Sequence, residues 1–124
     1  MKLLTYSPVA GVERLGVLIG DKILDLEFGH RAAAGVVPFP LGYLPSNILD
    51  FLRLGNAAMD TASALCKWFE SNEDKEDIAE FWYYASSVSL CSPVPRPTSM
   101  RDGYAFRQHV EAARRNRGLE MIPE

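Results

Sequence analysis

Cysteine is scarce in this sequence. Cys66 and Cys91 are the only two, and no CxxC or histidine-paired spacing accompanies them. This pattern argues against a disulfide framework and against a structural zinc site. One disulfide between the two is the alternative. We expect two buried, reduced thiols, because a lone bridge is uncommon in a chain without a secretory segment.

Long apolar runs and an excess of one charge are also missing. The apolar stretches fall far short of the roughly 20 residues that span a bilayer. Ser7-Pro8 follows residues 1–6 too early for a signal peptide. The net charge of −3 gives no general attraction to nucleic acids or acidic membranes. Because hydrophobic residues make up 48% of the chain, we expect a globular domain. Without a membrane span or a signal peptide, we expect it in the cytoplasm, and we expect no binding to nucleic acids or membranes.

The first half of the chain predicts strands and a hairpin. Three short apolar runs are typical of strands, at residues 3–6, 13–20 and 23–26. Gly20 and Asp21 lie between the second and third runs, which is a hairpin signal. Residues 31–45 are rich in Gly, Ala and Pro and predict an irregular connection.

Two helices are predicted next. Ser46 or Asn47 can cap a helix over residues 48–54, which Gly55 would end. Asn56 can then cap a second helix. Its apolar residues recur at helical spacing, which predicts a core face rather than a cofactor site: Met59, Ala62, Leu65, Cys66 and Phe69. With the strands, these helices give an α+β fold.

The stretch before the C-terminal part combines charge and aromatic residues. Residues 72–77 form a charged run without the glycine and final glutamate of an EF-hand, so we expect a solvated loop or the first turn of another helix. The aromatic residues 81–84 are expected to pack on the hairpin; a base-stacking platform would need basic neighbours. Residues 88–91 predict a period-two strand.

The residues with the most chemical character follow. Residues 93–97 read Pro-Val-Pro-Arg-Pro, which predicts a stiff extended strap, although such a motif also suits an SH3-type ligand. A helix is expected to begin at or just after Asp102 and to run to about Arg117, with Gly118 as its stop. If it begins at Asp102, then Asp102 and His109 share one helix face, two turns apart.

Structural roles are open for all of these side chains on their residue types alone. Asp102 is a good helix cap, and Asp-Gly is a common turn pair. His109 and Tyr104 are compatible with packing roles. The basic run at residues 114–117 suits the C-terminal end of a helix dipole, with nucleic-acid binding as the alternative.

Several stretches together carry a family resemblance. Near the C-terminus they are residues 93–97, Asp102-x-Tyr104, His109-Val110 and the Arg-Gly-Leu-Glu run at 117–120. Near the N-terminus they are residues 2–6 and the Gly-Val-Leu-Ile-Gly-Asp run at 16–21. With these features the sequence resembles the fumarylacetoacetate hydrolase family.

The resemblance implies an enzyme that hydrolyses a carbon–carbon bond in a diketo acid, or that decarboxylates or isomerises similar substrates. It implies that Asp102 is a ligand of a divalent metal, Mg²⁺ or Ca²⁺, that Tyr104 contacts the substrate and that His109 activates water. A hard cation can polarise a carbonyl, and a neutral imidazole can accept a proton from water. Gly103 departs from the family pattern, which commonly has a bulkier residue there.

For the fold, the resemblance implies a small SH3-like β-barrel domain with two or three helices over residues 1–97. Residues 98–124 would begin a larger catalytic domain. The family's other metal ligands, a Glu-x-Glu pair and a later aspartate, belong to that domain beyond residue 124. We therefore expect the missing catalytic domain as a partner, a homodimer for the complete protein, and no activity from this chain alone. The alternative is a non-catalytic binding or interaction module.

Overall fold

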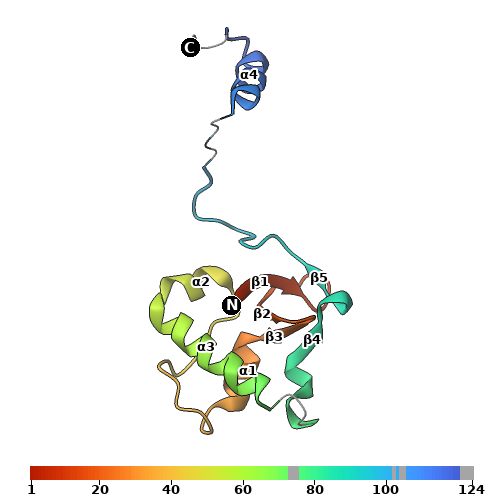
Figure 1. Cartoon of the computed structure of the whole chain (residues 1–124), viewed down its shortest axis with the longest axis vertical. Helices are drawn as coiled ribbons and strands as arrows, with labels where there is room; N and C mark the ends of the chain where they lie inside the picture. The colour runs from red at the N-terminus through yellow and green to blue at the C-terminus, as the bar shows by residue number, and fades with distance from the viewer. Residues whose placement is uncertain (73–75, 102, 104–105, 121–124) are drawn as a thin grey trace.

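A curled antiparallel sheet of five strands forms the centre of the protein. The structure is a computed structural model, and it describes residues 1–72, 76–101, 103 and 106–120. The strand order is β4-β3-β2-β1-β5. The strands are β1 (Lys2–Ser7), β2 (Arg14–Ile19), β3 (Lys22–Asp25), β4 (Trp82–Tyr84) and β5 (Ser89–Leu90) (Figure 1). The predicted hairpin is confirmed as β2 and β3, with Ile19 opposite Lys22 across the turn.

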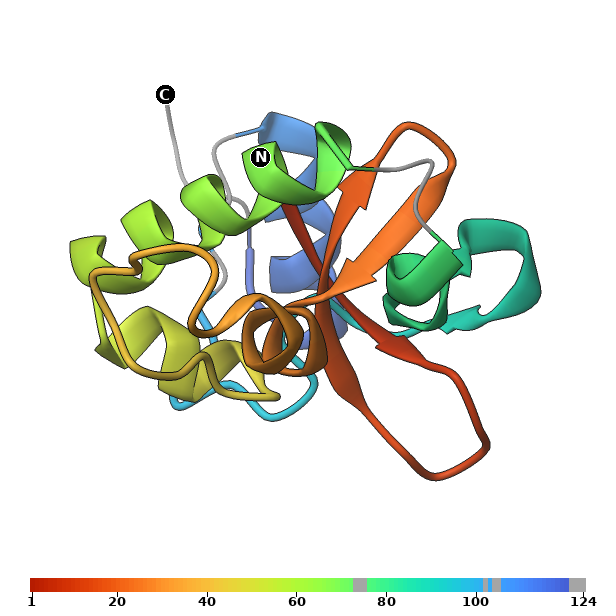
Figure 2. The same ribbon diagram turned by 90° about the horizontal axis from the view of Figure 1, so that it is seen from below.

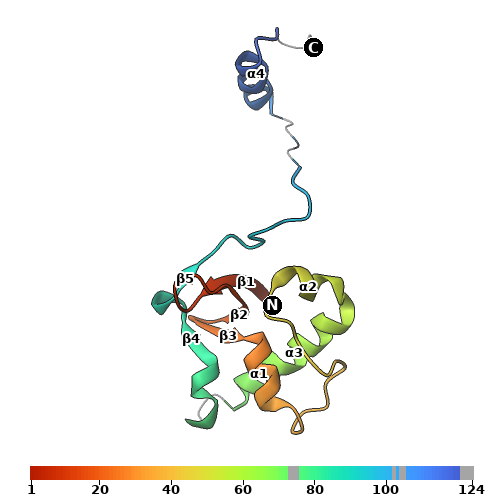
Figure 3. The same cartoon turned by 180° about the vertical axis from the view of Figure 1, so that it is seen from behind.

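Helices cover one side of this sheet (Figures 1 and 3). They are α1 (Leu26–Ala33), α2 (Ile48–Arg53) and α3 (Asn56–Glu70), and the predicted α+β class is confirmed. The core lies where the helices meet β2 and β3, and Phe51, Leu65 and Phe69 are fully buried there. Each such side chain stabilises the fold by about 1.5–3 kcal/mol when it is removed from water.

The predicted helix signals hold to within one residue. The Asn47 side chain accepts a hydrogen bond from the Asp50 N–H at 2.9 Å and so caps α2, as expected. The second helix is capped by Gly55, and Asn56 is already helical, so the cap predicted at Asn56 was wrong. The predicted apolar stripe is buried except for Met59, which is 39% exposed.

The helix α1 was not predicted, and it takes the first residues of the segment expected to be irregular. Asp25 caps it by accepting a hydrogen bond from the Phe28 N–H at 2.9 Å. Gly29 makes this helix hard to recognise from the sequence, because glycine is a poor helix former. Glycine suits the close packing there, since a Cβ would come within 3.1 Å of Leu24 Cδ1 and 3.3 Å of Phe69 and push these side chains aside by a few tenths of an ångström. Close packing of α1 on β3 and α3 therefore outweighs local propensity.

The aromatic residues and the cysteines follow the prediction in part. β4 pairs with β3 of the hairpin, with Tyr83 opposite Ile23, so the aromatic residues pack on the hairpin as expected. The Tyr83 ring also lies 5.4 Å from that of Tyr6 in β1, and the Trp82 ring 5.8 Å from that of Phe69 in α3, which was not predicted. Both cysteines are free thiols. Cys66 is buried, whereas Cys91 is half-buried, so the prediction of two buried thiols holds for Cys66 alone.

The remaining elements complete the chain. The short 3₁₀ helices η1 (Glu76–Phe81) and η2 (Ala85–Ser87) flank β4. After residue 97 the chain runs away from the body, and α4 (Arg107–Asn116) stands apart from the sheet and from the other helices (Figures 1 and 3). In the view from below, α4 overlaps the body (Figure 2). In the part of the chain that the structure describes, no helix has both the length and the apolar character needed to cross a membrane.

Candidate functional site

The three residues predicted to carry the chemistry all lie in the C-terminal arm, which we define as residues 98–120. Asp102 and Tyr104 fall outside the described residues, so their assignments stay predictions. His109 is the third residue of α4, and its side chain is exposed. The structure therefore describes one member of the predicted site, and it places that residue on a solvent-facing helix away from the body (Figure 3).

The start of α4 differs from the prediction. Gly103 is outside any helix, and Phe106 has extended backbone angles of φ −84° and ψ 130°. The helix begins at Arg107, so the start expected at or just after Asp102 was wrong. The shared face of Asp102 and His109 was conditional on a start at Asp102, which lies outside the described residues. Gly103 has low helix propensity, and the N-cap residue Phe106 has no side-chain group that could accept a hydrogen bond from the first turn of α4. These two features explain the late start.

The end of α4 is as predicted. Gly118 has φ +67°, a backbone conformation that glycine adopts without steric cost. The Gly118 N–H donates to the Arg115 carbonyl at 3.0 Å, and the Leu119 N–H to the Arg114 carbonyl at 2.9 Å, which together form a Schellman motif. Arg114 and Arg115 lie in the last turn, where positive charge complements the helix dipole.

The arm carries large apolar side chains that the body does not cover. Met100 is 86% exposed, Phe106 81% and Leu119 52%. No residue of α4 is buried, and Val110 and Ala113 reach only intermediate burial. Isolated helices this short are marginal in water without packing against another surface. The arm therefore has the composition of a segment that needs a covering surface.

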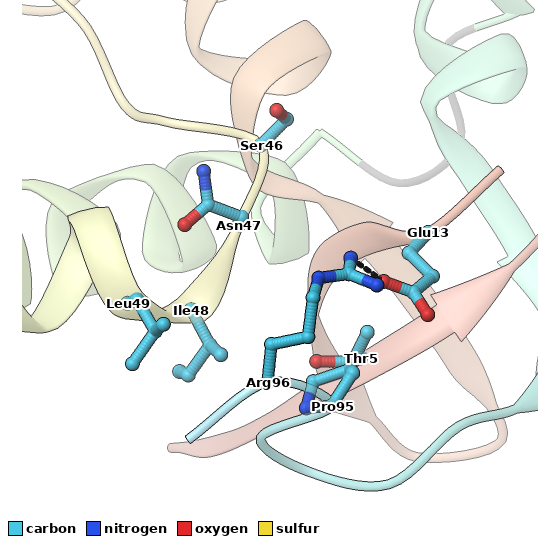
Figure 4. Close-up of a pocket in the computed structure, with 8 residues that line it drawn as sticks. All are labelled: Thr5, Glu13, Ser46, Asn47, Ile48, Leu49, Pro95 and Arg96. Atoms are coloured by element: carbon cyan, nitrogen blue, oxygen red, sulfur yellow. Dashed lines mark hydrogen bonds and ion pairs between the residues drawn. The ribbon is translucent and has the colours of Figure 1, made fainter. Parts of the chain in front are cut away.

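The strap at the root of the arm lies against the body. The Cys91 N–H donates to the Thr5 carbonyl at 3.0 Å, and the Thr5 hydroxyl donates to the Pro93 carbonyl at 2.9 Å. Arg96 forms an ion pair with Glu13, and Val94 packs against the hydrophobic core (Figure 4). The prediction that residues 93–97 form a strap rather than a free ligand motif agrees with these contacts.

A pocket of about 240 Å³ opens beside this strap (Figure 4). Its lining residues come from β1, from the residue before β2, from the start of α2 and from the strap: Thr5, Glu13, Ser46, Asn47, Ile48, Leu49, Pro95 and Arg96. Thr5, Asn47 and the Arg96–Glu13 pair already have partners within the protein. We interpret the pocket as a joint between strap and body rather than a binding site.

A second concentration of charge is buried inside the fold. Asp25 is fully buried, and Arg14 donates to it through Nε at 2.5 Å and Nη2 at 2.8 Å. The Tyr6 hydroxyl donates to the same carboxylate at 2.5 Å. Burial and this hydrogen bond raise the pKa of Tyr6 far above its usual range, and the bond to Asp25 raises the pKa of Arg14. All of these groups bind one another, so the cluster is structural.

Sequence reasoning missed both the buried cluster and the strap anchor. Arg14 and Asp25 lie at the ends of apolar runs and read as exposed strand ends. Arg14 reaches Asp25 only because the hairpin register sets Gly16, two residues along the same strand, opposite Asp25. Thr5 lies inside an apolar run, and nothing local connects it with Pro93.

The described residues do not by themselves make a metal centre. They include no group of three or more His, Cys, Asp or Glu side chains that could hold an ion. The predicted ligand Asp102 is outside the described residues, and hard cations such as Mg²⁺ take about six oxygen ligands. These residues alone therefore do not fit the metal that the family resemblance implies.

Comparison with known proteins adds one relationship. No family model matches the chain. The chain is 26% identical over 99 residues to oxaloacetate tautomerase YisK of Bacillus subtilis (strain 168). That match covers 77% of this chain but 31% of the relative, so the chain spans under a third of that protein's length. Because YisK is a member of the fumarylacetoacetate hydrolase family, the similarity loosely supports the resemblance in the sequence.

Proposed function

We propose that this chain is the N-terminal part of a fumarylacetoacetate hydrolase-like enzyme. The similarity to oxaloacetate tautomerase over 77% of the chain is the observation that carries the proposal. In it, residues 1–97 correspond to the family's small SH3-like domain, and residues 98–124 begin the segment that enters the active site. The division between a packed body and an outlying α4 supports this arrangement (Figure 1).

The proposed substrate is a small diketo or oxo-dicarboxylic acid. Hydrolysis of a carbon–carbon bond, decarboxylation and keto–enol isomerisation of such acids all place negative charge on a carbon next to a carbonyl. The name of the relative favours isomerisation among the three. His109 would move the proton as a general acid or base, taking it from water in a hydrolase or from the substrate carbon in a tautomerase. Tyr104 would contact the substrate.

The metal belongs to this proposal through the family resemblance. Asp102 would supply one ligand, and the others would come from a catalytic domain outside this sequence. Mg²⁺ or Ca²⁺ would supply the charge that stabilises the enolate oxygen. The same domain would cover the exposed apolar residues Met100, Phe106 and Leu119. The complete protein would form a homodimer.

The test compares variants of the complete protein that contains this chain. His109→Ala should lower kcat by about 10²- to 10⁴-fold, the usual contribution of a positioned general base. Gln108→Ala is the matched control, since it changes the preceding exposed residue of the same helix. The assay follows loss of the ultraviolet absorbance of enol-oxaloacetate, with a diketo acid as the second substrate.

Asp102→Asn separates the metal role from a structural one. Asparagine caps a helix or turn about as well as aspartate, so a structural Asp102 would tolerate the change. A metal ligand would not, and excess Mg²⁺ should then restore part of the lost activity. A fully active His109→Ala protein would remove the catalytic assignment and favour the non-catalytic interaction module.

A further inference from the structure

Two contacts of Thr5, one through its backbone and one through its buried side chain, hold the junction between the body and the strap. β5 pairs with the end of β1, with Leu90 opposite Tyr6. The next two contacts both involve Thr5: its carbonyl accepts from the Cys91 N–H at 3.0 Å, and its hydroxyl donates to the Pro93 carbonyl at 2.9 Å. Thr5 therefore holds the chain on both sides of Ser92, just before the strap at residues 93–97.

The burial of Thr5 makes this contact specific. Thr5 is 5% exposed, so water cannot easily replace the strap as a partner for its hydroxyl. A buried hydroxyl without a hydrogen bond is costly, which favours the one strap position that satisfies it. The Arg96–Glu13 ion pair is a weaker second tie, because the Arg96 side chain is 79% exposed and solvent screens such pairs.

The strap can transmit this position along the chain. Pro93, Pro95 and Pro97 each have a fixed φ angle, and each also restricts the residue before it. Val94 packs on the hydrophobic core between the first two prolines. A stiff segment that is anchored at one end sets the direction in which the following residues leave the body.

We infer that Thr5 is a positioning residue: its hydrogen bond to Pro93 sets where the arm enters the active site. This inference rests on the proposed function, in which the arm carries Asp102, Tyr104 and His109. Thr5 touches no reacting atom in this scheme. It acts through the strap, and its loss should lower kcat while KM changes little.

The experiment uses Thr5→Val, which keeps the branched shape and removes the hydroxyl. Thr61→Val is the matched control. Thr61 is also buried, and its hydroxyl donates to the Ala57 carbonyl at 2.8 Å and accepts from the Leu41 N–H at 3.1 Å, away from the strap. Both variants lose a buried hydroxyl, so both should lose stability. Only Thr5→Val should release the strap.

The first readout is nuclear magnetic resonance of the 124-residue chain. In Thr5→Val, the backbone order parameters of Val94 and Arg96 should fall from about 0.85 toward 0.6, the range of flexible loops. They should stay high in Thr61→Val. Unchanged order at Val94 and Arg96 in Thr5→Val would overturn the inference.

The second readout is the kinetics of the complete protein with an oxo-dicarboxylic acid. Thr5→Val should lower kcat about tenfold or more, since small misplacement of catalytic groups is costly, whereas Thr61→Val should keep its kcat. An equal loss of kcat in the two variants would show a general effect of lower stability and would overturn the inference. A failure of the proposed function would look different from a failure of this inference. In that case the unmodified protein would be inactive, while Thr5→Val would still lower the order parameters of Val94 and Arg96.

Discussion

Replacing Asp25 by asparagine tests the buried charge cluster. The carboxylate accepts hydrogen bonds from Arg14, from the Tyr6 hydroxyl and from the Phe28 N–H, and so joins β1, β2 and α1. Asparagine has the same shape and can still cap α1. It removes the negative charge and replaces one acceptor oxygen with a donor group. Arg14 would then lose its main buried counter-ion.

The size of the effect follows from burial. Removing one partner of a buried ion pair costs about 3–5 kcal/mol, because the other charge is left uncompensated. Arg14 keeps a second ionic partner, Glu27 at 3.1 Å, whose side chain is 31% exposed. We therefore expect the lower end of that range, about 3 kcal/mol. Since small domains have total stabilities of roughly 5–15 kcal/mol, the loss is a large fraction of the whole.

Urea unfolding followed by the fluorescence of Trp68 and Trp82 would measure this loss. The control is Asp50→Asn. Asp50 also pairs with an arginine, Arg53 at 2.7 Å, but the Asp50 side chain is 51% exposed. The urea midpoint of Asp50→Asn should therefore barely differ from that of the unmodified chain. A midpoint shift for Asp25→Asn no larger than that of the control would refute the reasoning.

Three further predictions concern a thiol, the arm and metal binding. Burial raises the pKa of Cys66 from 9.0 to about 11, so stability present below pH 9 should be lost between pH 9 and 11, on the order of 2 kcal/mol. Urea midpoints measured across this pH range should show the loss of stability, and Cys66→Ala should not show it. The same pH dependence in Cys66→Ala and in the unmodified chain would contradict its assignment to Cys66. Amide hydrogens of residues 98–120 should exchange faster than those of the β2–β3 hairpin, because no residue of α4 is buried, and equal protection would argue against an uncovered arm. Calorimetric titration of the 124-residue chain with Mg²⁺ or Ca²⁺ should reveal no micromolar site, since one carboxylate cannot replace the water shell of a hard cation; a micromolar site would count against shared ligation.

The candidate site was predictable only in part. The motif residues and the arm that contains them follow from the sequence, and the Gly118 helix end agrees with the structure. The helix start was misjudged because Asp102 resembles a cap, whereas Gly103 lies outside the helix and α4 begins at Arg107. Asp102 and Tyr104 lie outside the described residues, and in the proposed function the other ligands come from a further domain, so packing among the described residues does not define the site.

The sequence by itself determined the features that depend on a few neighbouring residues. Gly20 and Asp21 specify a hairpin turn, Asn47 specifies the start of α2, and Gly118 specifies the end of α4, because each signal acts through backbone geometry within one turn. These features were correct without knowledge of the rest of the fold.

The tertiary structure alone decided the features that join distant residues. Gly29 is unfavourable in an isolated helix, yet it allows α1 to pack closely on Leu24 and Phe69, where a Cβ would lie within 3.1–3.3 Å of both side chains. The hairpin register brings Arg14 to Asp25, and sheet pairing brings Thr5 to Pro93, which is 88 residues away. Such pairs have no local signature, because their free energy comes from burial that exists only after the chain has folded.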